Sequence, residues 1–276
     1  MMLTIHEISS RQNAQFKQLR EVVTDARARR SLQRAWVEGA RLSQAAAKQT
    51  VERQGRFELV ISEGVSLTSV TDALGIPDHQ LQAMVGQVIQ LSRALFEEIS
   101  QVETSIGWGL VISTASATVT KGDIVILDRI QDPGNLGAIF RTAAAAGITQ
   151  VWCLQGSTDP WSPKALRAGM GAHFALSIRD QLSESTLLTE LASLGVSCFA
   201  TANHPQAEAL YAPGLPLEQP CAWIFGQEGD GVSETLMAQS VLVRIPQSSE
   251  VESLNVSHAA AVCLFEMQRR RHYAGQ

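Results

Sequence analysis

Two polar loops in the last quarter of the sequence follow short apolar segments and could bind a ligand through their backbone. The first is Gly226–Gly231 (GQEGDG), which follows the apolar segment Cys221–Phe225, and the second begins at Pro246, after Val241–Ile245. Glycine permits positive φ and lets a ligand approach the backbone closely. Ligands of open α/β sheets bind at the carboxyl ends of strands. A single loop of this kind is usually a plain connection, but two in succession favour a binding site.

A third polar segment, GNLGAIFR, has Asn135 at a predicted helix start and Arg141 nearly two turns later. Its spacing does not fit the dinucleotide pattern G-x-G-x-x-G, and it has no Walker lysine. Backbone N–H groups at a helix start attract phosphate, and a guanidinium can hold phosphate with two hydrogen bonds. If this segment is considered alone, the simpler alternative to phosphate binding is that Asn135 caps the helix and Arg141 forms a surface ion pair.

Three motifs together resemble those of the SpoU (TrmH) family, the RNA 2'-O-ribose methyltransferases of the SPOUT superfamily. They are N-x-G-x-x-x-R at Asn135–Arg141, F-G-x-E-G-x-G at Phe225–Gly231, and I-P followed by S-L-N-V-S at Ser253–Ser257. Order and spacing both match, over roughly residues 123 to 271. The N-terminal part is more weakly similar to the family's RNA-binding domain, in the sequence W-V-E-G. The chain departs from the usual family pattern at Gly169, Gln247 and Ser249, which leaves substrate contacts open.

The resemblance implies a fold and a reaction. The fold is α/β: a C-terminal SPOUT domain with a deep trefoil knot, a parallel sheet flanked by helices, and a small N-terminal α/β domain resembling ribosomal proteins. The reaction is transfer of a methyl group from S-adenosyl-L-methionine to a ribose 2'-hydroxyl of structured RNA, ribosomal RNA rather than tRNA. The resemblance also implies a homodimer in which Arg141 of one subunit completes the site of the other, with no metal and no membrane. A non-catalytic RNA-binding or ribosome-assembly protein on the same fold is the alternative.

The motifs and the resemblance together nominate two sets of site residues. The catalytic candidates are Asn135, Arg141, Glu228, Ser253 and Asn255. The candidates for cofactor binding are Phe225, Gly226, Gly229, Ile245, Leu254 and Ala259.

A ribose hydroxyl is a very weak acid, so the enzyme must orient its oxygen and help to remove its proton. Arg141, working with a substrate phosphate, is the expected activating group, and Asn135 would position the ribose or the phosphate. His258 is the one histidine in the motifs, and we expect it to face into the last helix. The identity of the general base stays open.

The N-terminal part is locally basic although the whole chain carries a formal net charge of -5. Residues 1 to 53 contain ten Lys and Arg against five Asp and Glu. Residues 11 to 30 are typical of one basic helix with Phe16, Leu19 and Val23 on its apolar face. A phosphate-contacting surface and an ordinary solvated helix face are equally good interpretations. The RNA-binding candidates are Arg11, Lys17, Arg27, Arg30 and Arg41.

Alternating strands and helices predict two α/β domains, 1–113 and 122–276, joined by a small polar linker at 114–121. Predicted strands are Ala35–Gly39, Phe57–Ser62, Val88–Leu91, Gly109–Ser113, Asp123–Leu127, Gln150–Leu154, His173–Ile178, Val196–Ala200, Cys221–Phe225 and Val241–Ile245. Predicted helices of the second domain include Leu136–Ala146, Pro163–Met170, Ser183–Leu194 and Asn255–His272.

Composition narrows the class of protein. An apolar content of 45% suffices for a core, and no segment approaches the roughly 18 apolar residues of a membrane span. The N-terminus lacks the apolar core of a signal peptide. The four cysteines are widely spaced within apolar segments, which is typical of reduced core residues in a cytoplasmic protein. A metabolic α/β enzyme is disfavoured, because the motif loops contain no nucleophile–base pair and no metal cluster.

Overall fold

The computed structural model describes residues 3–114, 119–251 and 253–273, and the chain divides into two compact units. The first unit is Met1–Ala115 together with Trp161–Phe174, and the second is Ser116–Pro160 together with Ala175–Gln276. The predicted linker falls partly on residues 115–118, which lie outside the described residues. No helix among the described residues is long and apolar enough to cross a membrane.

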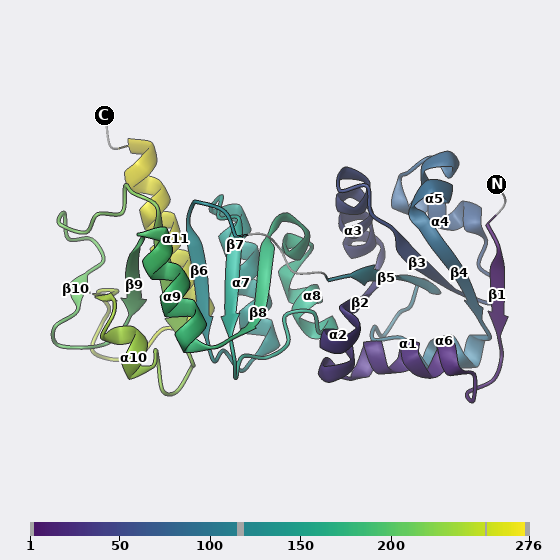
Figure 1. The fold of residues 1–276 in the computed structure, drawn as a ribbon, viewed down its shortest axis with the longest axis horizontal. Coiled ribbons are helices and arrows are strands. Elements are labelled where there is room, and N and C mark those ends of the chain that lie inside the picture. The colour runs from purple at the N-terminus through teal and green to yellow at the C-terminus, as the bar shows by residue number, and fades with distance from the viewer. Residues whose placement is uncertain (1–2, 115–118, 252, 274–276) are drawn as a thin grey trace. The chain divides into compact units, whose positions relative to one another are not determined.

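The first unit contains a mixed five-stranded sheet (Figure 1), in the order β1-β4-β3-β5-β2. Strands β1, β3 and β4 are parallel, and β5 runs antiparallel to both β3 and β2. The strands are β1 (Ile5–Ile8), β2 (Arg34–Glu38), β3 (Phe57–Ser62), β4 (Val85–Leu91) and β5 (Trp108–Ser113).

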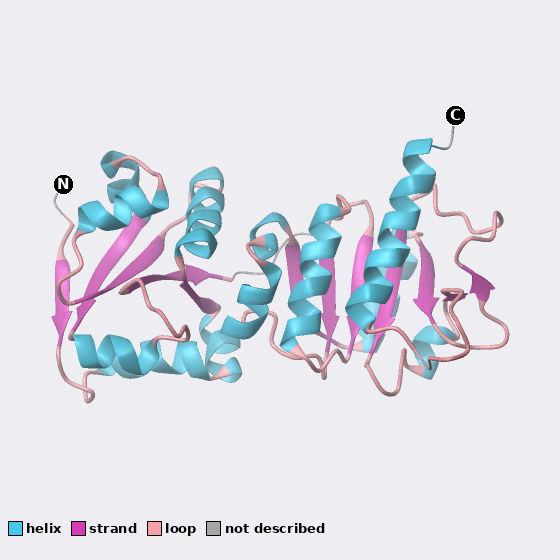
Figure 2. Cartoon of the chain, turned by 180° about the vertical axis from the view of Figure 1, so that it is seen from behind, coloured by secondary structure: helices cyan, strands magenta, loops and turns pink. Residues whose placement is uncertain are grey.

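Helices cover both faces of this sheet, as Figures 1 and 2 show. Successive strand residues point to opposite faces, so Leu59 and Ile61 of β3 pack on one side and Val60 packs on the other. The helices of this unit are α1 (Ala14–Thr24), α2 (Ala26–Leu32), α3 (Ala40–Glu52), α4 (Leu67–Leu74), α5 (Asp78–Met84), α6 (Arg93–Ile99) and α8 (Pro163–Gly169). Leu166 of α8 is fully buried in the same core cluster as Leu59, which ties Trp161–Phe174 to this unit.

The prediction of one basic helix over residues 11 to 30 is wrong. Asp25 has extended backbone angles, φ −116° and ψ 121°, which end α1, and its carboxylate accepts a hydrogen bond from the Arg27 N–H to begin α2. Arg29 is 5% exposed and donates to the carbonyls of Val22 and Val23, both at 2.9 Å. One of the basic residues therefore holds the turn between the helices instead of facing solvent.

The second unit is a seven-stranded sheet in the order β10-β12-β9-β11-β6-β7-β8, and all its strand pairs are parallel. Its strands are β6 (Ile124–Asp128), β7 (Gln150–Leu154), β8 (Ser177–Leu182), β9 (Ser197–Thr201), β10 (Glu208–Ala209), β11 (Cys221–Gly226) and β12 (Val241–Arg244). Its helices are α7 (Pro133–Ala145), α9 (Glu184–Leu194), α10 (Glu234–Met237) and α11 (Val256–Tyr273). Buried apolar runs such as β6 are typical of a parallel sheet covered on both faces.

Helices α9 and α10 pack on one face of this sheet, where Leu187, Leu191 and Leu236 join the core cluster of Ile126 and Ile224. Helices α7 and α11 pack against one another and lie side by side in Figure 2. The predicted strand His173–Ile178 is wrong at its start, because the 3-10 turn η1 (Ala172–Ala175) precedes β8. The His173 ring is buried with its centroid 5.6 Å from that of Trp161, which fits a turn and not a strand.

Candidate functional site

The topology of the second sheet gathers the three motif loops at one edge. Strand β6 is hydrogen-bonded to β11, and β11 and β12 flank β9. Because all these strands are parallel, the loops after β6, β11 and β12 all leave the sheet at its carboxyl edge. The sheet therefore brings the three motif loops to one edge, and a ligand site at that edge stays a prediction.

Three side chains, one from each motif, form a hydrogen-bonded chain across these loops. The Asn135 amide Nδ2 donates to Glu228 Oε1 at 3.0 Å, and the Asn255 amide Nδ2 donates to Asn135 Oδ1 at 3.0 Å. These residues stand 93 and 120 positions apart in the sequence. Asn135 uses both ends of its amide, as donor and as acceptor, so it is the link between the other two loops.

Glu228 also accepts backbone hydrogen bonds from the loop after β6. The N–H groups of Gln131 and Asp132 donate to its two carboxylate oxygens at 3.3 and 3.4 Å. Burial by itself raises the pKa of Glu228, but the hydrogen bonds from Asn135 and from the backbone outweigh it and bring the pKa below its usual value. The side chain is exposed and ionised at neutral pH, which makes it a poor proton acceptor and a good anchor for hydrogen-bond donors.

Two helix caps fix the asparagines. Asp132 Oδ1 accepts from the N–H groups of Gly134 and Asn135 at 2.6 and 3.0 Å, and Pro133 occupies the first helical position of α7. Asn255 Oδ1 accepts from the Ser257 N–H at 2.8 Å before α11 begins. Both asparagines therefore lie at helix N-termini, where the positive end of the helix dipole favours an anion.

The glycine loop after β11 requires its first glycine. A Cβ at Gly226 would lie 2.1 Å from the carbonyl carbon of Gly231 and 2.1 Å from the Val232 nitrogen, distances that no side chain tolerates. The loop closes on itself through a hydrogen bond of 2.8 Å from the Gly231 N–H to the Gln227 carbonyl, and Gln227 Oε1 accepts from the Gly229 N–H at 2.9 Å. The backbone is thus held in one compact conformation.

Comparison with known proteins now gives the family. The model of the SpoU rRNA Methylase family matches residues 123–265, slightly more than half of the chain. This chain belongs to the SpoU rRNA Methylase family.

Relatives in the SpoU family match different shares of the chain. It is 33% identical over 184 residues to the 23S rRNA (guanosine(2553)-2'-O)-methyltransferase RlmP of Bacillus subtilis, covering 66% of this chain and 73% of that one. It is 40% identical over 149 residues to an uncharacterized tRNA/rRNA methyltransferase of Synechocystis, covering 53% of each. The chain thus spans about half the length of some curated relatives that it matches.

Solved structures match nearly the whole chain. An AdoMet-bound rRNA methyltransferase from Sinorhizobium meliloti superposes with a TM-score of 0.80 at 25% identity, covering 97% of this chain and 98% of that one. A TrmH-family RNA methyltransferase described as putative, from Porphyromonas gingivalis, gives a TM-score of 0.74 at 29% identity, covering 95% and 100%. Residues 3–114, which the family model does not cover, therefore also have structural counterparts.

The site contains residues of the SpoU motif region that sequence reasoning did not single out. Asp128, 1% exposed at the end of β6, accepts from the Ser233 N–H at 2.7 Å and pairs with Arg129 at 2.9 Å. Arg129 has φ 58°, uncommon for a residue with a side chain, and also donates to the Gly231 carbonyl at 3.3 Å. The hydrogen bond to Asp128 raises the pKa of the Arg129 guanidinium. In the sequence, the only sign of these two site residues is that a carboxylate and a guanidinium directly follow the predicted strand Asp123–Leu127.

The cofactor candidates differ in what they expose. The Phe225 side chain is fully buried and stacked on Trp223, so only its backbone can reach a ligand. Leu254 is 39% exposed, and Ile245 and Ala259 are half-buried. Within the described part of the chain, the backbone groups of Ile245 and Leu254 make no hydrogen bond and are available to a ligand.

Three further motif residues lie apart from the hydrogen-bonded chain. Arg141 is exposed on α7, and its guanidinium makes no hydrogen bond or ion pair with any described residue. Ser253 is exposed in the loop before α11. His258 is exposed as well, so the expectation that it faces into α11 is wrong; the buried side chains of that stretch are Val256 and Ala260.

The RNA-binding candidates lie in the first unit and differ in their exposure and ion pairing. Lys17, Arg27 and Arg41 are exposed, whereas Arg30 is half-buried. Arg11 donates to Glu98 at 2.6 Å, and the Arg11 guanidinium holds the pKa of that carboxyl below its usual value. The charge of Arg11 is thus partly neutralised by its neighbour.

The described residues contain no group of three or more His, Cys, Asp or Glu side chains able to hold a metal ion. All four cysteines are free, and burial raises the pKa of Cys221 to about 12 and that of Cys263 further. Thiols of this kind are inert core residues at neutral pH.

Proposed function

We propose that this protein transfers a methyl group from S-adenosyl-L-methionine to a ribose 2'-hydroxyl of structured RNA, ribosomal RNA rather than tRNA. The observation that carries the proposal is the hydrogen-bonded chain Glu228–Asn135–Asn255, which unites the three family motifs at one sheet edge. Relatives named as 23S rRNA 2'-O-methyltransferases support the substrate class. We propose the cytoplasm as the site of action.

The loops fit the proposed cofactor, which supplies an electrophilic methyl group carried on a sulfonium. Gly226 and Gly229 offer backbone without side chains, and the unpaired backbone groups of Ile245 and Leu254 suit an adenine and an amino acid. The exposed Leu254 side chain provides apolar surface for a heterocycle. A neighbour titled as AdoMet-bound gives independent support.

In the proposed mechanism the chain's residues orient the ribose and stabilise charge. Asn135, held through both ends of its amide, positions the ribose or its phosphate beside the N-terminus of α7. Glu228 and Asn255 keep that amide in place, and Ser253 is free to contact the substrate. Arg141 stabilises the developing alkoxide together with a substrate phosphate, a task that suits a guanidinium with no other partner among the described residues.

A homodimer through α7 and α11 would complete the site. Arg141 on α7 and Phe265 on α11 are exposed, the latter by 50%, on two helices that pack together. Aromatic side chains and arginines are enriched at protein interfaces, which makes these two helices the candidate surface. We propose that Arg141 enters the site of the partner subunit, and that Lys17, Arg27, Arg30 and Arg41 of the first unit hold RNA phosphates, with a smaller part for Arg11.

A deep trefoil knot in the second unit is part of the proposal. After β11 the chain passes out to β12, beyond β9, and returns to α11, which packs on α7. We propose that this return is threaded through a loop, an arrangement that ordinary folding rules would exclude. Family membership supports this path.

The test is methyl transfer from labelled cofactor to bacterial 23S rRNA transcripts, with the modified nucleotide mapped by resistance of its 2'-O-methylated linkage to alkali. We expect incorporation at one ribose. Cofactor binding without transfer to 23S, 16S or tRNA transcripts would favour a non-catalytic RNA-binding protein. Mixing Arg141→Ala with Asn255→Ala subunits tests the dimer, because activity returns only if Arg141 acts across subunits.

A further inference from the structure

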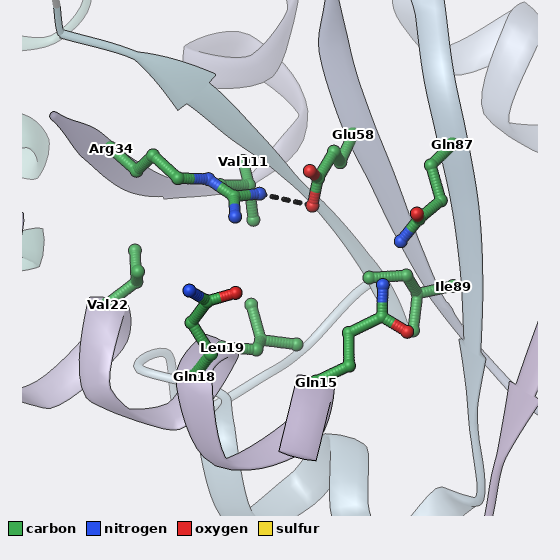
Figure 3. Close-up of a pocket in the computed structure, with 9 residues that line it drawn as sticks. All are labelled: Gln15, Gln18, Leu19, Val22, Arg34, Glu58, Gln87, Ile89 and Val111. Atoms are coloured by element: carbon green, nitrogen blue, oxygen red, sulfur yellow. Dashed lines mark ion pairs between the residues drawn. The ribbon is translucent and has the colours of Figure 1, made fainter. Parts of the chain in front are cut away.

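The first unit contains a polar cavity of about 250 Å³ between α1 and the sheet (Figure 3). Its floor is apolar, made by the buried side chains of Leu19, Val22, Ile89 and Val111. Figure 3 shows Gln15 and Gln18 of α1 facing Arg34, Glu58 and Gln87 from the strands. Strand register brings the side chains of Glu58, Gln87 and Val111 together on one face of the sheet, because Glu58 pairs with both Gln87 and Val111.

One buried side-chain atom of the residues that line this cavity lacks a partner among the described residues. The Gln87 amide Nε2 is buried and makes no hydrogen bond with any described residue. An unsatisfied buried donor costs about 1–3 kcal/mol, so such a group calls for an explanation. A β-bulge lies next to it: the register of β3 and β4 shifts between Phe57 and Glu58, and β4 gains Gly86 as an extra residue. Bulges commonly re-aim a side chain beside a site, here Gln87.

The charges of the cavity select the class of ligand. Arg34 and Glu58 form an ion pair, and the other polar lining groups are the neutral amides of Gln15, Gln18 and Gln87. A balanced lining disfavours phosphate, carboxylate and metal ions. Amides that donate and accept, above an apolar floor, match the edges and the flat face of a nucleobase. The volume is smaller than the roughly 300–1,000 Å³ of pockets for drug-sized ligands, which suits a single base.

We propose that this cavity receives one unpaired base of the RNA substrate. The inference rests on the proposed function for the presence of RNA. Lys17, next to Gln18, and Arg56, two residues before Glu58, are exposed and form no ion pair with a described residue. They can hold the phosphates on either side of an inserted base, whereas a free metabolite would leave them without a role. The first unit thus reads a base in a loop or bulge, besides contributing charge.

The test uses the full-length protein and two hairpin RNAs with identical stems. One loop has a random sequence, and the other carries abasic riboses, so the phosphates are the same and only the bases differ. We expect the protein to bind the random loop about tenfold more tightly, the effect typical of one stacked and hydrogen-bonded base. Gln87→Met keeps the volume and removes the amide, and we expect it to lose most of that preference. Gln90→Met, on the opposite face of the same strand, is the matched control.

Gln18→Ala gives a second variant, on an exposed helix position where the fold is not at risk. Cross-linking of 4-thiouridine in the loop should map to the α1 and β4 peptides. Equal affinity for the two hairpins, or cross-links only outside these peptides, would overturn the cavity as a base site and leave water as its occupant. Methyl transfer is scored separately: base preference without transfer to any RNA contradicts the proposed function but not this inference, and transfer without base preference does the reverse.

Discussion

Glu38 in the first unit and Glu228 in the second are both carboxylates at the centre of a hydrogen-bond cluster. Glu38 is 6% exposed and accepts from Trp36 Nε1 at 3.2 Å, the Gln101 N–H at 2.8 Å, and the hydroxyls of Ser100 and Ser105 at 2.6 and 3.0 Å. Glu228 is exposed and accepts from Asn135 and from two backbone N–H groups.

The difference is one of burial and therefore of role. Trp36 is 1% exposed, so its indole N–H cannot turn to water if the Glu38 carboxylate is removed, and we expect this cluster to maintain the fold of its unit. The donors around Glu228 have access to water, so that cluster adds little stability and instead holds three loops in register. The same side-chain chemistry thus serves stability in one unit and, as we propose, a reaction in the other.

Of the substitutions considered, Glu38→Ala should have the largest effect, on the stability of the fold. Leaving the Trp36 N–H buried without an acceptor, and removing the bonds from Gln101 and the two serines, should lower the free energy of unfolding by about 3 kcal/mol or more, measured by urea denaturation. Glu38→Gln should cost less than about 1 kcal/mol, because its amide oxygen can still face these N–H groups while its NH₂ donates to the two serine hydroxyls. If Glu38→Ala were as stable as Glu38→Gln, the cluster would not maintain the fold.

Arg141→Ala should have the next largest effect, on transfer alone. Loss of a charge-assisted contact in the transition state should slow single-turnover methyl transfer by about a hundredfold or more. Stability should change by less than about 0.5 kcal/mol, since Arg141 is exposed, and calorimetric cofactor affinity should be unchanged. Arg269→Ala on α11 is the control, because the Arg269 side chain is exposed and its partner Glu266 keeps an ion pair with Arg270. If Arg141→Ala lost cofactor affinity as strongly as transfer rate, Arg141 would instead be a cofactor-binding residue.

Glu228→Ala should show the contrast with Glu38 directly. Freeing Asn135 from one of its partners should slow transfer by about tenfold, from the loss of a hydrogen bond to a charged group. The free energy of unfolding should fall by less than about 1 kcal/mol, because the donors become solvated. A loss of stability matching that of Glu38→Ala would mean that Glu228 has the same structural role.

The smallest effect concerns pH. The folded-state pKa of Glu228 is below the usual 4.5, so the carboxylate and its contribution are fully present above that pH and are lost as the pH falls through the lowered value. The ratio of the transfer rate of the wild type to that of Glu228→Ala should therefore be constant from about pH 7 to about pH 5 and decline only below the usual pKa of 4.5. Glu228→Gln should lack this acid limb when single-turnover transfer is compared in the same way. An inflection near neutral pH would instead indicate another titrating group.

Much of the second unit could be predicted from sequence, because strands such as β6, β7 and β11 are nearly continuous apolar runs. The strand Cys221–Gly226 and the glycine loop after it are local features, since Gly226 has no room for a Cβ in that turn. Asn135 was nominated from a predicted helix start, whereas Glu228 and Asn255 were nominated from the resemblance to the family motifs, and their roles stay predictions. The start of β8 was missed because Ala172–Ala175 is apolar enough for either a strand or a buried turn.

The sequence by itself determined the alternation of elements, the loops at strand ends and the residue types in them, since these follow from hydrophobic period and turn chemistry. Only the tertiary structure decided which side chains meet. The bonds from Asn135 to Glu228 and Asn255 depend on β6, β11 and β12 sharing one carboxyl edge, and strand order is not a local property. The burial of Arg29 and Glu38 and the unpaired amide of Gln87 likewise depend on what packs above them, which a charge count along the chain cannot reveal.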